Sequence, residues 1–491
     1  MAAFLSLPSE LIPSIFAYLS DEDYFTARLT CKYLEAATLS HFGKQFFRKK
    51  GYLITSPSLN VLRSVARHPE LRKHVQHVWF NPDLYTFVMP ECTPDPHWPY
   101  AQIYGQRVEE EQQSYEIYQD CMHDHRNMLY SSNLRELLTE TFQSLPHLEV
   151  VGMRRSEDHR PWGWSRLKDA IGEDPRILGS IPSGPMSSLS GPTHLFLAII
   201  HALSASNVML KRLYTDAVEI DNILPTVLSQ EKYDTALPAM LYLEINASKA
   251  WLTQKARNAR TVEDVQAGDG LLSLLRATPQ LRELGLQIFR DLRQSYLVPP
   301  ASRNPDSWRQ SYPYLTFEKL SRGLQLQCLT RLKLEKLITS AETLKAFMKP
   351  SRANLISIKI RDVRLLSTTQ EPRPWGPVFQ FCRDDCPQLS YVLFYHLMYE
   401  LGGVSFVERP PAPVPYPDVE NATGAPNPPF GEPAGGELFI RYDHIALEGN
   451  GRADVQAKLE RIVERHWYQQ PIFSYAMDES LWHTDTSDEE M

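Results

Sequence analysis

The sequence is poor in cysteine and in basic charge, and each shortage excludes a class of protein. Only 6 cysteines occur among 491 residues, and they are not closely spaced, so they do not form the disulfide framework of a small secreted protein. Lysine and arginine number 51 against 59 aspartate and glutamate, which gives a formal net charge of -8. Nucleic acids and membrane surfaces attract basic proteins, so we expect neither as a partner.

Long apolar runs and a secretory signal are also missing. The most continuous apolar stretch, residues 195–203, is far shorter than the roughly 20 residues needed to span a bilayer. Residues 1–11 have no basic segment, and Pro8 and Glu10 interrupt their short apolar stretch. We therefore expect an intracellular protein, located in the cytoplasm or the nucleus.

Motifs of catalysis and metal binding are scarce. The sequence has no Gly-x-x-x-x-Gly-Lys loop, no His-Glu-x-x-His and no Gly-x-Ser-x-Gly. Cys121, His123 and His125 lie close together, and Cys382 and Cys386 are four residues apart, but a zinc site needs a second pair at a matching spacing. We expect no metal, no cofactor and no enzymatic activity. An enzyme whose residues meet only in the fold stays open as an alternative.

The first fifty residues contain the clearest pattern. Apolar residues recur with the period of a helix that has one broad apolar face, at Leu11, Ile12, Ile15, Phe16 and Leu19. Ser20 can cap a second helix, with Asp23 at the acidic position of a capping box, and this helix is predicted to run over residues 24–39. A third short helix is predicted around residues 42–47. Three helices of this length cannot bury a large core, so we expect the unit to need a partner surface.

This segment resembles the F-box family. The matching residues are Leu7-Pro8-Ser9-Glu10-Leu11, Ile15, Phe16, Leu19, Asp23, Arg28-Leu29-Thr30-Cys31-Lys32 and Leu34, about a tenth of the chain. The resemblance implies that the Leu-Pro turn and the apolar faces after it bind a small Skp-type adaptor, which joins a cullin scaffold. The residues expected to bind the adaptor are Leu7, Pro8, Leu11, Ile12, Ile15, Phe16, Leu19, Leu29, Cys31 and Leu34. The alternative is a plain helical cap on the repeats that follow.

A second pattern runs through the rest of the chain. Apolar residues recur at i, i+3 and i+5 in Val75/Val78/Phe80, Leu148/Val151/Met153, Leu210/Leu213/Thr215, Met240/Leu243/Ile245, Leu281/Leu284/Leu286, Leu329/Leu332/Leu334, Leu355/Ile358/Ile360 and Leu389/Val392/Phe394. The last two residues of each triplet lie on one face of a strand. A proline stands two residues before four of the triplets, and a helical pattern precedes most of them, so the repeating unit reads helix, turn, strand.

These triplets match the core of a leucine-rich repeat, although their spacing is uneven. From the triplet that starts at Met240 onward, intervals between successive starts range from 26 residues (329 to 355) to 48 residues (281 to 329), whereas regular repeats run about 20–29. The pattern resembles the irregular, insertion-rich repeats that accompany many fungal F-boxes. An unrelated α/β domain with parallel strands is the alternative.

The sequence therefore predicts a fold of the α+β or α/β class, with an N-terminal three-helix F-box followed by an irregular leucine-rich-repeat solenoid. The expected boundaries are 1–50 for the F-box, 51–406 for the repeats, 407–437 for a proline-rich loop or linker, 438–476 for a C-terminal cap and 477–491 for an acidic disordered tail. Inserts at residues 90–99 and 161–192 are expected to be rim loops. The function expected from the resemblance is that of a non-catalytic substrate adaptor in a Skp–cullin–F-box ubiquitin ligase, with an unknown protein substrate on the repeats. A repeat scaffold acting outside ubiquitination is the alternative.

Overall fold

The computed structural model describes residues 7–82, 101–154, 160–171, 190–218, 237–247, 267–288, 309, 312–366, 374–399, 402–406, 446–464 and 467–469. The helices are α2 (Leu11–Phe16), α3 (Asp21–Thr30), α4 (Lys32–Phe46), α5 (Ser56–Arg67), η1 (Leu71–Lys73), α6 (Ala101–Tyr130), α7 (Ser132–Gln143), α8 (Trp164–Ile171), α10 (Ser190–Ser206), α13 (Ala267–Arg276), α16 (Tyr312–Gly323), α17 (Ala341–Met348), η5 (Lys349–Ser351), α18 (Trp375–Asp384) and α19 (Arg452–Glu464). The strands are β1 (Lys49–Leu53), β2 (His77–Asn81), β3 (Val150–Met153), β4 (Arg212–Val218), β5 (Tyr242–Ala247), β6 (Glu283–Gln287), β7 (Arg331–Glu335), β8 (Ile338–Ser340), β9 (Ser357–Arg361), β10 (Arg364–Leu366), β11 (Tyr391–Tyr395), β12 (Met398–Tyr399), β13 (Gly402–Ser405), β14 (Ala446–Asn450) and β15 (Trp467–Gln469).

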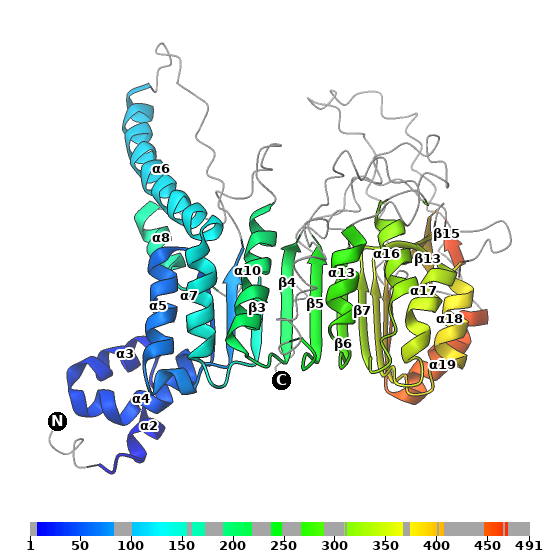
Figure 1. The fold of residues 1–491 in the computed structure, drawn as a ribbon, viewed down its shortest axis with the longest axis horizontal. Helices are drawn as coiled ribbons and strands as arrows, with labels where there is room; N and C mark the ends of the chain where they lie inside the picture. Colours follow the sequence, from blue (N-terminus) through cyan, green and yellow to red (C-terminus); the bar gives the residue numbers. More distant parts are fainter. Residues whose placement is uncertain are drawn as a thin grey trace, which may run out of the picture.

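The chain forms an N-terminal helical unit, α2 to α4, followed by a mixed α/β region with a large parallel sheet, which we call the sheet body. Ten strands pair in the order β1-β2-β3-β4-β5-β6-β7-β9-β11-β14. Neighbouring strands are parallel except that β14 is antiparallel to β11. In Figure 1, helices α7, α10, α13, α16 and α17 lie in front of this sheet, and the helical unit extends from its lower left corner. We call the opposite side of the sheet the open face.

The sheet is held in register by two rows of buried apolar side chains that point toward the helices. One row contains Val78, Val151, Leu213, Leu243, Leu284, Leu332, Ile358 and Val392. The other contains Phe80, Met153, Ile245, Leu286, Leu334, Ile360 and Phe394. Full burial of each such side chain stabilises the fold by about 1.5–3 kcal/mol. Slipping one strand by one residue would move its apolar side chains to the open face, so the pattern fixes the register.

The eight apolar triplets are confirmed as strands, because each lies in or directly before one of β2 to β7, β9 or β11. Two predictions about helices are wrong. The second helix does not run over residues 24–39 with a separate third helix after it, because Cys31 is extended (φ -158°, ψ 155°) and divides α3 from α4. The insert at 161–192 is not all loop, because α8 lies within it and buries Trp164 and Leu167 against Tyr118 and Met122.

Three later strands end with the same turn. Lys336, Asp362 and His396 follow β7, β9 and β11 directly and have positive φ values of 51°, 53° and 50°. A buried apolar residue comes next each time, and the chain then enters a short strand, β8, β10 or β12. These short strands join β13 and β15 in a second sheet of order β15-β13-β12-β10-β8, which the sequence analysis did not predict.

Long stretches between described segments follow the carboxyl ends of four strands. The stretches between described segments at 83–100, 219–236, 248–266 and 289–308 follow the carboxyl ends of β2, β4, β5 and β6. The predicted insert at 90–99, the proline-rich segment 407–437 and the tail 477–491 lie outside the described residues. Within the predicted C-terminal cap, residues 438–476, the described elements are β14, α19 and β15. Within the described part of the chain, no helix is both long and apolar enough to span a membrane.

Candidate functional site on the N-terminal helices

Helix α2 divides its apolar residues between two directions. The backbone N–H of Leu11 donates to the carbonyl of Pro8 at 3.0 Å, so the Leu-Pro turn leads directly into the helix. Pro13 lies in the first helical turn, where a missing N–H removes no intrahelical bond. Ile12 and Phe16 point into the unit and are fully buried, whereas Leu11 and Ile15 are exposed. The apolar residues that the sequence places on one broad face of the helix are therefore divided, with some packed in the core and others in contact with solvent.

The core of the helical unit is small and aromatic. Its buried members are Ile12, Phe16, Tyr24 and Leu34. The ring of Tyr24 stands edge-on to Phe16 with centroids 5.0 Å apart. Its hydroxyl lies 3.0 Å from Nδ1 of His41 in α4, and burial raises the pKa of the Tyr24 phenol. This buried tyrosine joins all three helices.

Helix α3 begins at the predicted cap and presents two apolar side chains to solvent. The side chain of Ser20 accepts a hydrogen bond from the backbone N–H of Asp23 at 3.1 Å. Three acidic residues occupy the first turn, where their negative charge interacts favourably with the positive end of the helix dipole. Phe25 and Leu29, one helical turn apart, are both exposed. Leu29 is 87% exposed, and together with Phe25 it places apolar surface on the solvent side of α3.

Helix α4 is held against the rest of the unit by polar and cation–π contacts and against the sheet body by side-chain packing. The hydroxyl of Tyr33 donates to the carbonyl of Leu7 at 3.2 Å and so holds the Leu-Pro turn. The guanidinium of Arg28 lies 3.8 Å from the ring centroid of Phe42. Phe42 also packs against the core of the sheet body, and a Cβ on Gly43 would meet the ring of His74 at 2.5 Å. The helical unit is therefore attached to the body through closely packed side chains.

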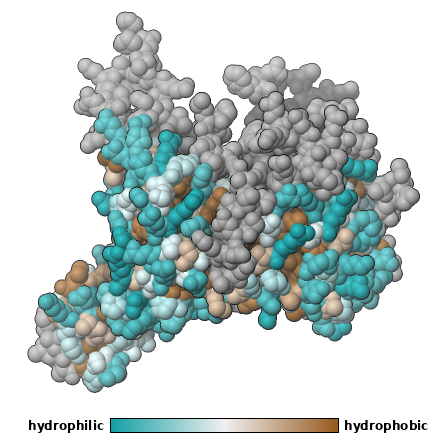
Figure 2. Space-filling model, in the orientation of Figure 1, coloured by the Kyte–Doolittle hydropathy of each residue, from teal (hydrophilic) through white to brown (hydrophobic). Residues whose placement is uncertain are grey.

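Exposed apolar residues concentrate on this unit. The large hydrophobic side chains exposed on it are Leu11, Ile15, Tyr18, Phe25, Leu29 and Tyr33. In the whole remainder of the described chain, the corresponding residues are only Tyr130, Trp162, Met209 and Ile356. Figure 2 shows hydrophobic residues reaching the surface of the unit at its lower left. Apolar clusters of this kind mark surfaces that bind another protein.

The ten residues predicted to bind the adaptor take different positions. Pro8, Leu11, Ile15 and Leu29 are exposed, Leu7, Leu19 and Cys31 are half-buried against the core, and Ile12, Phe16 and Leu34 are buried. The sequence analysis missed Tyr18, Phe25 and Tyr33 as surface residues. Tyr18 is 92% exposed and continues the spacing of Leu11 and Ile15 at i+7, a signal that the sequence did contain.

The candidate metal residues do not come together. Among the described residues, no three His, Cys, Asp or Glu side chains are grouped so that they could hold a metal ion. His125 is buried in α6, and burial lowers its pKa to about 4. Burial raises the pKa of the Cys121 thiol to about 11 and that of Cys386 to about 12, so both thiols stay protonated near neutral pH.

The geometry therefore defines a small three-helix module with a solvent-facing apolar surface, joined to an α/β body. Residues 4–45 match the model of the F-box-like family. No curated protein matches the chain in sequence. F-box domains generally bind Skp-type adaptors, so the match and the exposed apolar surface both indicate a protein-binding module.

Proposed function

We propose that this protein is the substrate-recognition adaptor of a Skp–cullin–F-box ubiquitin ligase. The observation that carries the proposal is the exposed apolar surface of a module that matches the F-box-like family. Leu11, Ile15 and Leu29 would bind the Skp-type adaptor directly, and Ile12 and Phe16 would hold α2 in place. Tyr18 and Phe25 extend the same surface and add to the residues predicted from the sequence.

We also infer that the sheet body is an irregular leucine-rich-repeat array that holds a protein substrate. The strands follow one another in chain order with their apolar rows aligned, as stacked repeats require. The identical turns after β7, β9 and β11 add a second repeated feature. The long inserts follow the carboxyl ends of the strands, a location where repeat and α/β proteins often carry binding loops.

In this proposal the protein itself is not catalytic. It holds a substrate near a cullin-bound ubiquitin-transfer enzyme and so raises the effective concentration of the acceptor lysine. The packing of Phe42 and Gly43 against the body supports such a role, since a fixed attachment would set the orientation of the substrate toward the rest of the complex.

The test is co-purification with a Skp-type adaptor, followed by titration calorimetry of the purified pair. Leu29→Ala removes an exposed side chain that contributes little to folding, so we expect binding to weaken by about 1–2 kcal/mol or more, with the melting temperature unchanged. The double variant Leu7→Ala/Pro8→Ala should also lose binding, but Leu7 packs on the small core, so its melting temperature must be measured beside it.

The matched control is Ile356→Ala, which trims an exposed aliphatic side chain of the sheet body. It should bind the adaptor like the wild type. Equal binding by wild type and the Leu29 variant would contradict the proposed adaptor surface. Binding of the adaptor without recruitment of a cullin in a three-component gel filtration would favour the scaffold alternative.

A further inference from the structure

The ten-stranded sheet ends at β1 on one side and at β14 on the other. An outer strand carries a row of backbone N–H and C=O groups that can pair with a strand of another molecule. The backbone of Trp162 occupies the outer edge of β1, because its N–H donates to the carbonyl of Gly51 at 2.7 Å and its carbonyl accepts from the N–H of Leu53 at 3.3 Å. The outer edge of β14 is occupied in a different way.

The hydrogen bonds at the end of β14 show which of its backbone groups point outward. The N–H of Gly451 donates to the carbonyl of Ser390 at 2.7 Å, so Gly451 bonds toward β11. Along an antiparallel strand, residues that bond toward the partner strand alternate with residues that bond away from it. Glu448 and Asn450 therefore direct their N–H and C=O groups away from β11, toward the outer edge.

Two side chains of α19 bind to these outward groups. Nζ of Lys458 donates to the carbonyl of Glu448 at 2.6 Å, and the N–H of Asn450 donates to Oδ2 of Asp454 at 2.8 Å. Lys458 and Asp454 are one helical turn apart and contact each other at 2.9 Å. Hydrogen bonds from Lys458 and from the Asn450 N–H lower the pKa of the Asp454 carboxyl, so it stays charged at neutral pH. The pair thus occupies polar groups that a neighbouring strand would use.

Helix α19 is held in the position that this contact requires. Val455, Leu459 and Ile462 are fully buried, and the helix packs against β14, β11 and α18. Asp454 and Lys458 each precede one of these buried residues and are 41% and 34% exposed. The pair therefore lies at the border between the packed face of α19 and solvent, beside the outer edge of β14.

We propose that Asp454 and Lys458 protect the outer edge of β14 from strand addition by a second copy of this chain. Without the pair, the outward groups of Glu448 and Asn450 would face an identical edge, and two antiparallel strands related by a two-fold axis would bond. Charged side chains at outer strands are a common means of preventing such pairing. The inference does not depend on the proposed adaptor role, because no residue of the helical unit takes part in it.

The experiment measures the molar mass of the full chain by gel filtration with light scattering over a range of concentrations. Asp454→Ala/Lys458→Ala should raise the mass about twofold over wild type at high concentration. The change removes one charge of each sign, so the net charge of -8 is unaltered and cannot explain the association. The matched control, Glu318→Ala/Arg322→Ala, removes another pair one helical turn apart, on α16, and should keep the wild-type mass.

Two further variants separate strand pairing from loss of folding, with circular dichroism as the check of structure. Lys458→Met keeps the aliphatic stem and the contact of Asp454 with Asn450, so it should stay folded and still gain mass. It decides the question if the alanine variant does not fold. Adding Glu448→Pro to the alanine variant removes an outward N–H without removing a bond to β11, so it should restore the wild-type mass.

Three results would overturn the proposal. One is a wild-type mass at every concentration in the folded alanine variant or, where that variant does not fold, in Lys458→Met. Another is an equal gain of mass in the α16 control, which would mean that loss of any surface ion pair causes association. The third is association that persists in the variant with Glu448→Pro, which would place the contact somewhere other than the outer edge of β14.

Discussion

The helical unit and the sheet body differ in how completely they bury their apolar side chains. The unit buries four large side chains and leaves six exposed, whereas one continuous core in the body extends from Phe47 to Ile462. A module that exposes so much apolar surface is suited to binding a partner, and a body with a complete core can present charged side chains instead. The two regions therefore differ in how much apolar surface they offer to a partner.

The largest expected effect contrasts one residue from each region. Phe394 is fully buried in β11, with its ring 5.3 Å from that of Phe379, so Phe394→Ala should cost about 3–5 kcal/mol of unfolding free energy. Leu29→Ala should cost less than about 0.5 kcal/mol, because its side chain is already in water. Urea denaturation followed by fluorescence measures both. A loss of several kcal/mol in the Leu29 variant would mean that Leu29 belongs to a core.

The next effect concerns acid sensitivity of the body. Burial of His125 lowers its pKa from 6.5 to about 4, and a carboxylate neighbour, Asp124, only partly offsets this. The folded protein therefore prefers the neutral imidazole, and its stability is fully present above pH 6.5 and is lost as the pH falls toward 4. The full loss is about 3 kcal/mol. Melting temperatures measured across this range should fall less for His125→Leu than for wild type, and parallel curves would contradict the assignment.

The strands were predictable from sequence because burial of one face of a sheet makes apolar residues alternate along each strand with a period of two. Leu281, Leu284 and Leu286 repeat a spacing that returns in each later strand, and the structure aligns them in one core. Strand β1 was missed because Gly51, Tyr52 and Leu53 lack that spacing and a preceding proline. The second sheet was missed because β8, β10 and β12 contain only two or three residues each, too few to form a pattern.

The candidate surfaces were less predictable than the strands. On α2, the apolar residues spaced around one helix do not reveal which of them face a core, and only packing against Tyr24 separates Ile12 and Phe16 from Leu11 and Ile15. The contact of Lys359 with Tyr391 was invisible in sequence for another reason. Lys359 and Tyr391 lie 32 positions apart, and the parallel pairing of β9 with β11 alone brings them together.

A smaller effect tests the crowded half of the open face. Gly152→Ala should destabilise the body by about 1–3 kcal/mol, because its Cβ would overlap the ring of Tyr214, which is buried and held by His77. In a Tyr214→Ala background the same substitution should cost much less, and a double-mutant cycle by urea denaturation measures the difference. Additive effects would show that Gly152 is required for its backbone conformation rather than to leave space for the ring of Tyr214.

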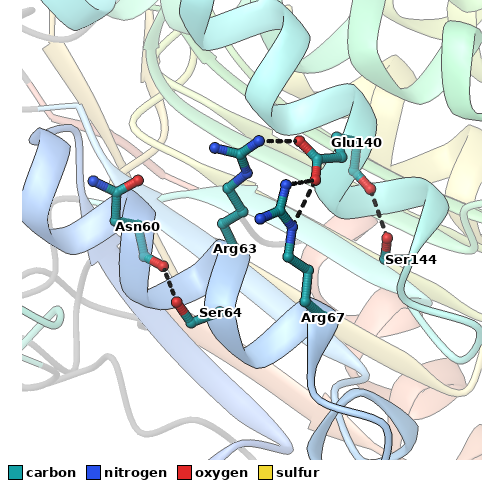
Figure 3. A network of polar contacts seen from close by, with 6 residues as sticks. All are labelled: Asn60, Arg63, Ser64, Arg67, Glu140 and Ser144. Atoms are coloured by element: carbon teal, nitrogen blue, oxygen red, sulfur yellow. Dashed lines mark hydrogen bonds and ion pairs between the residues drawn. The ribbon is translucent and has the colours of Figure 1, made fainter.

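The smallest effect should come from a charged contact on the surface of the body. Figure 3 shows Arg63 and Arg67 of α5 reaching Glu140 of α7, at 2.7 and 2.5 Å. Hydrogen bonds from Arg63 and Arg67 lower the pKa of Glu140 below its ordinary value of 4.5. The stabilisation is therefore present at neutral pH and disappears as the pH falls below 4.5 through the folded-state pKa.

These three side chains are 38%, 57% and 38% exposed, so solvent screens the contact, and Glu140→Gln should cost less than about 1 kcal/mol. The difference in melting temperature between wild type and variant should shrink in high salt, and it should disappear as the pH falls through the lowered pKa of Glu140. A cost of several kcal/mol that persists in salt would mean that polar contacts between the outer helices stabilise the body as strongly as its core does. The contrast between the two regions would then fail, because surface contacts would contribute as much to the stability of the body as its buried side chains do.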